Sequence, residues 1–280
     1  MRAQQLKANL GPWRYWWYWL RSACFQCSLV VTVLLFAPPI LLGALIPMSR
    51  QARWRYSYTI ARAWTQTALF SLRWLCGIQH EVHGRAWLPT SPAVVMTKHQ
   101  SAWETLAQLS ILPPQCWVLK RELLAVPFFG WALRTLKPIP VARGKDGAGR
   151  SGLHGVVENG TTRLREGLWV VVFPEGTRVK PGEPKRYRAG GAHLAVSAGV
   201  PVVPVAHNAG SHWMSGTVLK VPGTITMSIG PSIDPRGKTP AEVLEAARTW
   251  IEQEQKLLDP VAQQPQRARS NKNADDSAAA

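Results

Sequence analysis

The chain has 280 residues, which is enough for a complete hydrophobic core and for one or two domains. Its 33 Lys and Arg residues outnumber 16 Asp and Glu residues, giving a formal net charge of +17 and a sequence pI near 10.4. The length therefore excludes a peptide without a core, and the net charge predicts a surface that attracts anionic partners.

The first 80 residues carry more than half of this excess charge. Before Glu81 there are nine basic residues and no acidic one, which contributes +9 of the +17. The nine are Arg2, Lys7, Arg14, Arg21, Arg50, Arg53, Arg55, Arg62 and Arg73. Seven of the 14 tryptophans lie here too: Trp13, Trp16, Trp17, Trp19, Trp54, Trp64 and Trp74. Such a segment suits single-stranded nucleic acid, by stacking and phosphate contacts, or a lipid headgroup boundary.

An uncharged gap between Arg21 and Arg50 decides between these partners. Its centre, residues 29–46, reads LVVTVLLFAPPILLGALI, a run that nucleic-acid modules do not use. We therefore expect membrane lipids as partners and no nucleic acid. As one straight helix, the 28 residues of the gap (22–49) would rise about 42 Å, more than the roughly 30 Å of a hydrocarbon core.

We favour a bent or re-entrant hairpin over a straight span for residues 29–46. Pro38-Pro39 should break the helix, because each ring removes a backbone donor and clashes with the preceding turn. Basic residues flank both ends of the gap, so the positive-inside rule gives no clear direction, and both ends would lie on the cytoplasmic side. A cleaved secretory signal is disfavoured, since no A-x-A-like site follows.

Residues 53–75 are predicted to form a second helix. One sector of its wheel holds Ile60, Trp64, Ala68, Leu72 and Leu75, and the opposite side holds Arg55, Arg62, Gln66 and Arg73. The pattern predicts a helix along a membrane surface; the alternative is a helix that packs its apolar side on the domain core. Residues 1–80 are thus predicted to be a membrane-anchoring, basic and aromatic helical segment.

Short apolar runs alternate with helix-like stretches from about residue 92. The runs are Ala93–Met96, Cys116–Leu119, Pro138–Val141, Trp169–Phe173, Val202–Ala206 and Thr224–Ile229, and the candidate helices lie near 102–111, 151–166, 189–198 and 240–257. This alternation predicts an α/β domain over residues 81–258, with a mixed, mostly buried sheet covered by helices. Pro204 predicts that its strand is an edge strand or an irregular one. Residues 259–280 are too polar to bury and are predicted to be a disordered tail.

Several minor patterns are assigned no chemistry. The stretch from Gly147 to Gly152 matches G-x-G-x-x-G, but no clean βαβ unit with an acidic residue follows, so we interpret it as a loop. Cys24-x-x-Cys27 has no second pair, and all four cysteines are interpreted as reduced and structural, with no metal site. Without companion ligands, four histidines are interpreted as ordinary loop residues: His80, His83, His207 and His212. No G-x-S-x-G elbow supports a serine hydrolase.

The stretch KHQSAWET places His99 five residues before Glu104, directly after an apolar run. Ser101-Ala-Trp-Glu104 fits the capping box S-x-x-E, in which Glu104 only starts a helix. Alternatively, a carboxylate folding back from the first turn can meet a histidine at a strand's end, fix its tautomer and stabilise its charged form as it takes a proton. The two roles are compatible.

A second stretch, Phe173-Pro-Glu-Gly-Thr-Arg178, follows another strong strand run. Loops at strand ends commonly hold ligands, and Arg178 offers a planar, permanently charged group suited to phosphate. A solvated turn is the alternative.

Together the two stretches resemble the glycerolipid acyltransferase family, most closely the bacterial 1-acyl-glycerol-3-phosphate acyltransferases, from about Lys98 to Ala206. The resemblance implies that His99 is the general base and that Glu104 orients it. It implies acceptor binding by Lys120 in Lys120-Arg-Glu-Leu, by Arg143 at the end of the block that begins at Pro138, and by Glu175, Gly176, Thr177 and Arg178. Residues 200–205 resemble a fourth block, usually assigned to catalysis or acyl-donor binding.

Two features depart from that family. Aspartate is usual where this chain has Glu104, whose side chain is longer by one methylene, about 1.5 Å. An acidic residue often precedes the arginine that aligns with Arg143, and here it is Ala142. The departures affect the reach of the carboxylate and the assignment of Arg143.

The resemblance implies a membrane-associated O-acyltransferase without a cofactor. Its co-substrate would be acyl-CoA or acyl carrier protein, and its acceptor the sn-2 hydroxyl of lysophosphatidic acid, giving phosphatidic acid for phospholipid biosynthesis. It also implies the bacterial inner (cytoplasmic) membrane, with the catalytic domain facing the cytoplasm. Two alternatives remain: acylation of another lyso-lipid, such as a lyso-ornithine lipid or a headgroup-bearing lysophospholipid, and a non-catalytic lipid-binding protein at the membrane surface.

Overall fold

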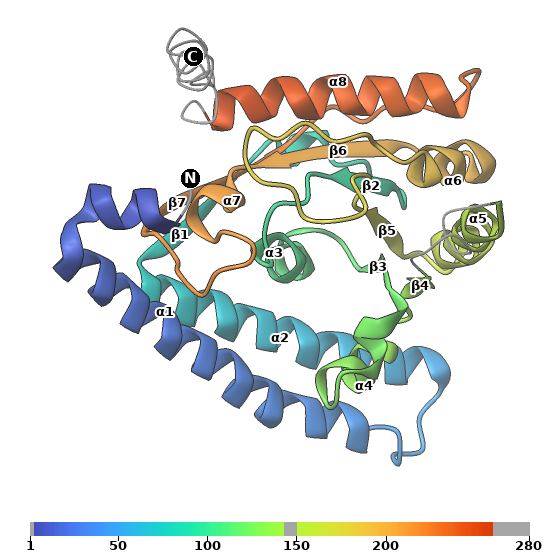
Figure 1. Ribbon diagram of the computed structural model, residues 1–280. Coiled ribbons are helices and arrows are strands. Elements are labelled where there is room, and N and C mark those ends of the chain that lie inside the picture. The colour runs from blue at the N-terminus through green and yellow to red at the C-terminus, as the bar shows by residue number, and fades with distance from the viewer. Residues whose placement is uncertain (1–2, 143–149, 260–280) are drawn as a thin grey trace, which may run out of the picture.

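The computed structural model describes residues 3–142 and 150–259, and its core is one seven-stranded sheet (Figure 1). The strand order is β1-β7-β6-β2-β5-β3-β4. The strands are β1 (Ile78–His83), β2 (Val94–Thr97), β3 (Gln115–Lys120), β4 (Ile139–Val141), β5 (Trp169–Val172), β6 (Val202–His207) and β7 (Gly223–Ile229). Neighbours pair in parallel except β6 and β7, which are antiparallel. The predicted mixed sheet is confirmed.

Helices cover both faces of this sheet (Figure 1). The helices are α1 (Ala3–Leu42), α2 (Arg50–Cys76), α3 (Trp103–Ile111), α4 (Phe129–Arg134), α5 (Arg150–Arg165), α6 (Gly190–Ala198), α7 (Ala209–His212) and α8 (Pro240–Leu258), with single 3-10 turns η1 (Arg85–Trp87) and η2 (Arg121–Ala125). Buried side chains of α5, α6 and α8 pack on one face, and those of α1, α2 and α3 pack on the other. The α/β class with covering helices is confirmed.

Two strand predictions need correction. Strand β1 was not predicted, because Ile78–His83 reads IQHEVH and only Ile78 is buried at this edge of the sheet. Pro204 does not lie in an edge strand, because β6 is an interior strand between β7 and β2. Its missing N–H faces the side on which β7 has already ended at Ile229, and its carbonyl accepts the Gly230 amide (2.9 Å). The proline is thus placed at a local irregularity, the second predicted possibility.

Helices α1 and α2 form a hairpin along one side of the domain (Figure 1). The indole N–H of Trp64 donates to Thr32 Oγ1 (3.1 Å), and the Tyr56 hydroxyl donates to the Pro39 carbonyl (3.1 Å). The expected break at Pro38-Pro39 is wrong, since α1 runs through both prolines to Leu42 and kinks instead at Gly11. Each proline lacks the N–H that would bond to the carbonyl one turn earlier, and the buried neighbours Ala37 and Ile40 hold the helix in place. Residues 11–42 are long and apolar enough to cross a membrane.

The apolar sector predicted for α2 packs against protein. Ala68 and Leu72 are buried, and the partly buried Ile60 and Leu75 pack on the core cluster that contains Leu72. Trp64 contacts Thr32 of α1 and Phe129 of α4. Packing on the domain core, the alternative interpretation, therefore describes this sector. The cause is that α1 and α3 both lie against α2, so its polar side and a few aromatic rings are left outside.

Candidate active site

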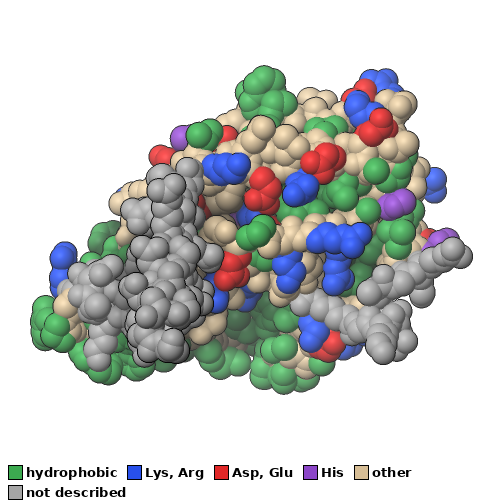
Figure 2. Space-filling model, turned by 45° about the horizontal axis from the view of Figure 1, so that its top comes forward, with side chains coloured by type: hydrophobic (Ala, Val, Ile, Leu, Met, Phe, Trp, Pro, Cys, Tyr) green, Lys and Arg blue, Asp and Glu red, His purple; other side chains and the backbone are tan. Residues whose placement is uncertain are grey.

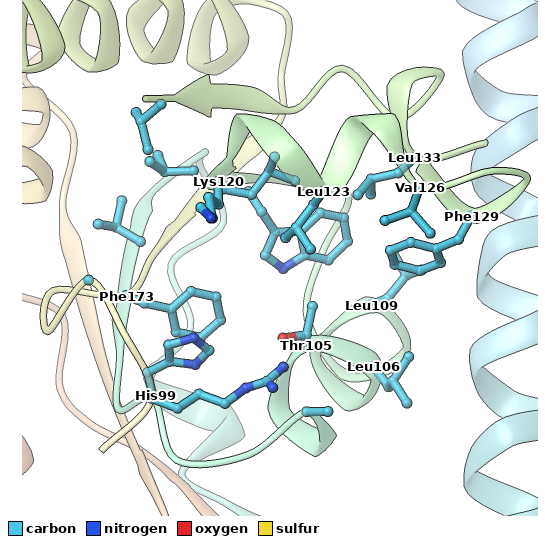
Figure 3. A pocket seen from close by; sticks show the side chains of 18 of the residues that line it. His99, Thr105, Leu106, Leu109, Lys120, Leu123, Val126, Phe129, Leu133 and Phe173 are labelled. Carbon is cyan, nitrogen blue, oxygen red and sulfur yellow. The ribbon is translucent and has the colours of Figure 1, made fainter. Parts of the chain in front are cut away.

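The two motifs come together at the carboxyl ends of neighbouring parallel strands. His99 follows β2, Phe173 follows β5, and Lys120 ends β3, and these strands lie side by side in the order β2-β5-β3. Parallel strands bring their carboxyl ends to one edge of a sheet, where ligands commonly bind. Their side chains reach one cavity (Figure 3).

His99 and Glu104 form a close pair. His99 Nδ1 lies 2.8 Å from Glu104 Oε1, and the carboxylate is fully buried. Glu104 Oε1 also accepts the backbone amides of Gln100 (3.0 Å) and Ser101 (2.9 Å). With Nδ1–H directed at the carboxylate, the neutral ring keeps Nε2 as a proton acceptor.

The capping role is present in a shifted form. Helix α3 begins at Trp103 rather than after Ser101, and the Ser101 hydroxyl accepts the Trp103 amide (3.2 Å). Glu104 returns to the Ser101 amide as the capping box requires. One carboxylate therefore both closes the turn and pairs with His99, so its longer side chain reaches the ring without loss of the cap.

Glu104 is held in its charged form. Burial opposes that charge, but the hydrogen bonds from His99 and from the Ser101 amide outweigh it, so the pKa of Glu104 lies below its usual value. A carboxylate that stays ionised can balance a positive charge that develops on the adjacent ring.

His207 is not the loop histidine that its sequence context suggested. It ends β6 and is fully buried. Its Nε2–H donates to the Lys98 carbonyl (2.9 Å), and its Nδ1 accepts the Ala209 amide (3.3 Å), so both ring nitrogens are used by a neutral ring. Burial lowers the pKa of His207. Its Nε2 also lies 3.9 Å from Glu104 Oε2, which makes it part of the shell around that carboxylate.

The three other predicted loop histidines also lie in regular structure. His80 and His83 belong to the exposed part of β1, and His212 ends the short α7. Their location in elements is a correction to the loop interpretation. Within residues 3–142 and 150–259 no cluster of three His, Cys, Asp or Glu side chains is arranged to hold a metal ion, and the four cysteines are unpaired.

Phe173 fixes the orientation of the His99 ring. The two rings stack with centroids 4.0 Å apart and planes 25° from parallel, and both point into the cavity (Figure 3). The Val179 amide donates to the His99 carbonyl (2.8 Å), which ties the loop after β5 to the loop after β2. Sequence reasoning missed Phe173 because only the charged part of FPEGTR suggested chemistry.

Glu175 is buried beside an unpredicted lysine. Lys98 Nζ lies 3.3 Å from Glu175 Oε1 and 2.7 Å from Glu252 Oε1 on α8, and its side chain is only 3% exposed. The Tyr187 hydroxyl donates to the same Glu252 (2.8 Å). Lys98 therefore joins the loop after β5 to α8, and burial raises the pKa of Glu175 despite this cation.

Replacing Lys98 with methionine is expected to destabilise the fold. The change keeps the apolar stem but leaves Glu175 buried without its cation, at a cost of about 3 kcal/mol. We take the lower end of the usual range because Glu252 is one-third exposed and water screens it. Urea unfolding of the purified protein measures the difference, and an unchanged midpoint would mean that the network contributes nothing.

The matched change Glu175→Gln is expected to act in the opposite direction above acidic pH. Because the pKa of Glu175 is raised from its usual 4.5, the folded state holds its proton more tightly, and stability is lost as the pH rises through the folded pKa. Glutamine removes this loss while Lys98 keeps Glu252. The unfolding free energies of wild type and Glu175→Gln should therefore be similar at acidic pH, and the variant should be the more stable of the two at neutral pH. A variant less stable than wild type at neutral pH would contradict the assignment.

Basic side chains line the same cavity. Predicted Lys120 and Arg178 are joined by Lys185, Arg186 and Arg188, which sequence reasoning did not select. Lys120 also pairs with Glu122 (3.4 Å). Gly176 has φ 70°, and a Cβ added there would lie only 3.0 Å from Arg188 Nε, so this position favours glycine. Thr177 is half-buried and does not line the cavity. Arg143 lies outside the described residues, as do residues 147–149 of the Gly147–Gly152 pattern, whose last three residues begin α5 and are not a loop. Figure 2 shows several Lys and Arg side chains on the face that it displays, with Asp and Glu side chains among them.

The cavity itself is large and changes character along its length. Its volume is about 1420 Å³, with His99, Lys120 and Arg178 among the polar lining residues. Away from these, Leu106, Leu109, Leu123, Val126, Phe129 and Leu133 close around it (Figure 3). Residues 29–40 of α1 supply another apolar wall. A basic, proton-accepting end joined to a long apolar chamber fits an amphiphile with an anionic head and an aliphatic chain.

The chain is similar in sequence to known proteins. The acyltransferase family model matches residues 79–208. The 1-acyl-sn-glycerol-3-phosphate acyltransferase of Pseudomonas aeruginosa is 40% identical over 216 residues, covering 76% of this chain and 82% of that protein. The human 1-acyl-sn-glycerol-3-phosphate acyltransferase alpha is 37% identical over 139 residues, 49% of this chain and 48% of that protein.

A solved structure agrees on the fold. The 1-acyl-sn-glycerophosphate (LPA) acyltransferase PlsC from Thermotoga maritima superimposes with a TM-score of 0.71 at 23% identity, covering 86% of this chain and 95% of that one. Fold and site thus define an O-acyltransferase associated with the membrane. The chain belongs to the acyltransferase family, within its 1-acyl-sn-glycerol-3-phosphate acyltransferase branch.

Proposed function

We propose that this enzyme transfers a fatty-acyl group from an acyl thioester to the sn-2 hydroxyl of 1-acyl-glycerol-3-phosphate, giving phosphatidic acid. The observation that carries the proposal is the His99–Glu104 pair at the junction between the basic and apolar parts of one cavity. The names of the relatives support the same acceptor. The reaction supplies a precursor for phospholipid synthesis.

His99 acts as the general base in this proposal. Its Nε2 takes the proton from the acceptor hydroxyl while the hydroxyl oxygen attacks the thioester carbonyl carbon. The tetrahedral intermediate collapses, the carbon–sulfur bond breaks, and the thiolate takes the proton back from His99. Glu104 balances the charge on the ring between these steps, and no acyl-enzyme forms. Proton transfer of this kind contributes about 10² to 10⁴ in rate.

Lys120 and Arg178 bind the acceptor phosphate, and Glu175, Gly176 and Thr177 shape the loop that presents Arg178. The cations lie on the same cavity as His99, so a bound phosphate would set the nearby hydroxyl beside the ring. Arg143 is assigned to the same phosphate on the resemblance alone.

Arg178→Ala is expected to raise the KM for a phosphate-bearing acceptor about tenfold, with a smaller effect on kcat. Loss of one charge-assisted contact to phosphate removes roughly 1.5 to 3 kcal/mol of binding. Initial rates over a range of lysophosphatidate concentrations measure the effect. Lys180→Ala is the matched control, because this neighbouring lysine is exposed and does not line the cavity. An unchanged KM in Arg178→Ala would refute the phosphate contact.

The apolar part of the cavity holds an acyl chain, and the donor is acyl-CoA or acyl carrier protein. Because residues 29–40 of α1 form part of the cavity wall, a bound acyl chain would lie beside the segment that can cross a membrane. We place the enzyme at the bacterial inner membrane with its site facing the cytoplasm, where acyl thioesters are made. Basic residues at both ends of the apolar segment favour that side.

Thiol release from a long-chain acyl-CoA, catalysed by membranes that contain the enzyme, tests the function. Lysophosphatidate is the expected acceptor, and acyl carrier protein replaces coenzyme A in a parallel series. Release with a headgroup-bearing lysophospholipid or a lyso-ornithine lipid, and none with lysophosphatidate, would assign a different acceptor. No release with any pair would favour a lipid-binding protein without this activity.

A further inference from the structure

An exposed apolar segment forms part of the cavity wall and also presents side chains to the outside. Seven large hydrophobic side chains that follow α2 in the described chain are strongly exposed, and four of them fall within residues 123–131. They are Leu123 (42%), Val126 (43%), Phe128 (39%) and Trp131 (44%). This segment, the η2–α4 wedge, joins η2 to α4. Such clustering marks an interaction surface rather than scattered surface hydrophobics.

The backbone of the wedge is strained at Phe128. Phe128 has φ 58° and ψ −61°, and the Phe129 amide donates to the Pro127 carbonyl (2.6 Å), which closes a tight γ-turn. A positive φ is unfavourable for a residue with a bulky side chain, and strain of this kind persists where function requires it. The exposed Phe128 ring lies against Trp131, with centroids 5.5 Å apart.

The wedge continues a surface that already suits a membrane. Helix α4 packs on α1, and the Phe129 ring contacts Trp64 of α2 (6.0 Å between centroids). The neighbouring stretch of α1 also exposes apolar side chains, including Leu34 (48%) and Leu35 (63%). In Figure 1, α1, α2 and α4 lie along the same side of the molecule, and in Figure 2 hydrophobic side chains line the lower edge.

The charges around the wedge indicate the kind of surface that covers it. Lys120 and Arg121 precede it and Arg134 follows it, while Glu122, paired with Lys120, is the single acidic residue between positions 120 and 137. Apolar and aromatic side chains bracketed by cations match the boundary between acyl chains and anionic headgroups. A soluble protein partner would not require this arrangement of charge.

We propose that the η2–α4 wedge inserts into the headgroup and upper acyl region of the bilayer beside α1. This inference builds on the proposed function, because a lipid acceptor and product must pass between the bilayer and the cavity. Leu123, Val126 and Phe128 line the cavity and are also exposed, so the wedge forms the side on which the cavity meets lipid.

Site-specific fluorescence of the full-length enzyme tests the insertion without any need for activity. The exposed Cys24 and Cys27 are first replaced by alanine, which leaves only buried thiols. Trp131→Cys and, separately, Leu257→Cys are labelled with an environment-sensitive dye and reconstituted in bilayers of phosphatidylethanolamine and phosphatidylglycerol. Leu257 is the matched control, since it is 75% exposed on α8, across the sheet from α1.

The label at position 131 is expected to brighten several-fold and to be quenched by lipids that carry a nitroxide in the upper acyl chain, while the label at 257 stays unchanged. Equal, weak quenching at both positions would overturn the proposal. Because this readout is independent of turnover, an inactive enzyme whose label is quenched would refute the proposed function and leave the insertion standing.

A kinetic comparison gives a second readout. Trp131 does not line the cavity, so Trp131→Asp is expected to raise the KM for long-chain lysophosphatidate in bilayers about tenfold and to leave turnover of a short-chain, monomeric acceptor unchanged. Trp87→Asp, at an exposed tryptophan of η1 (56%), should change neither. Equal losses on both acceptors, or no loss on either, would contradict the proposal.

Discussion

Replacement of His99 by alanine is expected to lower kcat for acyl transfer by about 10² to 10⁴ while the enzyme stays folded. The residue is largely buried (13% exposed), but its polar contacts serve the Glu104 carboxylate rather than the core. The fall in kcat measures the contribution of proton transfer to the His99 ring, which alanine cannot supply. Thiol release at saturating acceptor gives kcat, and circular dichroism reports the fold.

His83→Ala is the control for this change, because that histidine is exposed on the edge strand β1 and remote from the cavity. It should retain wild-type turnover. A His99 variant that keeps more than about a tenth of the wild-type rate is incompatible with general-base catalysis of the expected size.

Glu104→Gln is expected to lower kcat by about 10³, the second largest effect. The change removes the charge that balances a protonated His99 ring and allows the ring to adopt the wrong tautomer. Glutamine also has one acceptor oxygen, whereas both Glu104 oxygens accept from the Ser101 amide and Oε1 accepts from Gln100 as well. Stopped thiol-release assays combined with thermal unfolding separate the catalytic loss from the structural one.

Glu104→Asp provides the comparison, because it keeps the charge with a side chain shorter by one methylene. It should be more active than the glutamine variant and less active than the wild type, since the shorter carboxylate cannot satisfy the amides and the ring together. Full activity in Glu104→Gln would leave the residue with helix capping alone.

The parts of the site that depend on short sequence separation could be predicted. His99 and Glu104 are five positions apart across a strand-to-helix turn, so the chain geometry brings them together in any fold that keeps that turn. The six predicted strand runs all correspond to strands because the central sheet is buried on both faces and its segments are continuously apolar. Those signals are local.

The contacts that support the site could not be predicted, because they join distant parts of the chain. Lys98 and Glu252 are 154 positions apart, and His207 reaches the Lys98 carbonyl across 109. The only signal for His207 was its place directly after an apolar strand run. The short α4 and its exposed neighbours lack the length that a helical pattern needs, so the wedge was also missed.

The predicted helix break at one pair of prolines was the clearest error. A rule for isolated helices predicts a break at Pro38-Pro39, but the buried Ala37 and Ile40 beside them and the hydrogen bond from Tyr56 keep the helix continuous to Leu42. Tertiary packing thus outweighs the loss of the two backbone hydrogen bonds that the prolines cannot make.

Helix α1 is built into the folded domain as well as being apolar enough for a membrane. Its Phe25 is fully buried against Trp213 (5.2 Å between ring centroids), and its Ser22 hydroxyl accepts the Lys220 amide (2.9 Å). A truncated form that begins after residue 49 would therefore open the apolar cavity to water. It would also leave the Lys220 amide, in the loop before β7, without its hydrogen-bond acceptor. Attempts to obtain a water-soluble catalytic fragment should fail for this reason, and the enzyme has to be purified and assayed with its first helix and with lipid or detergent around it.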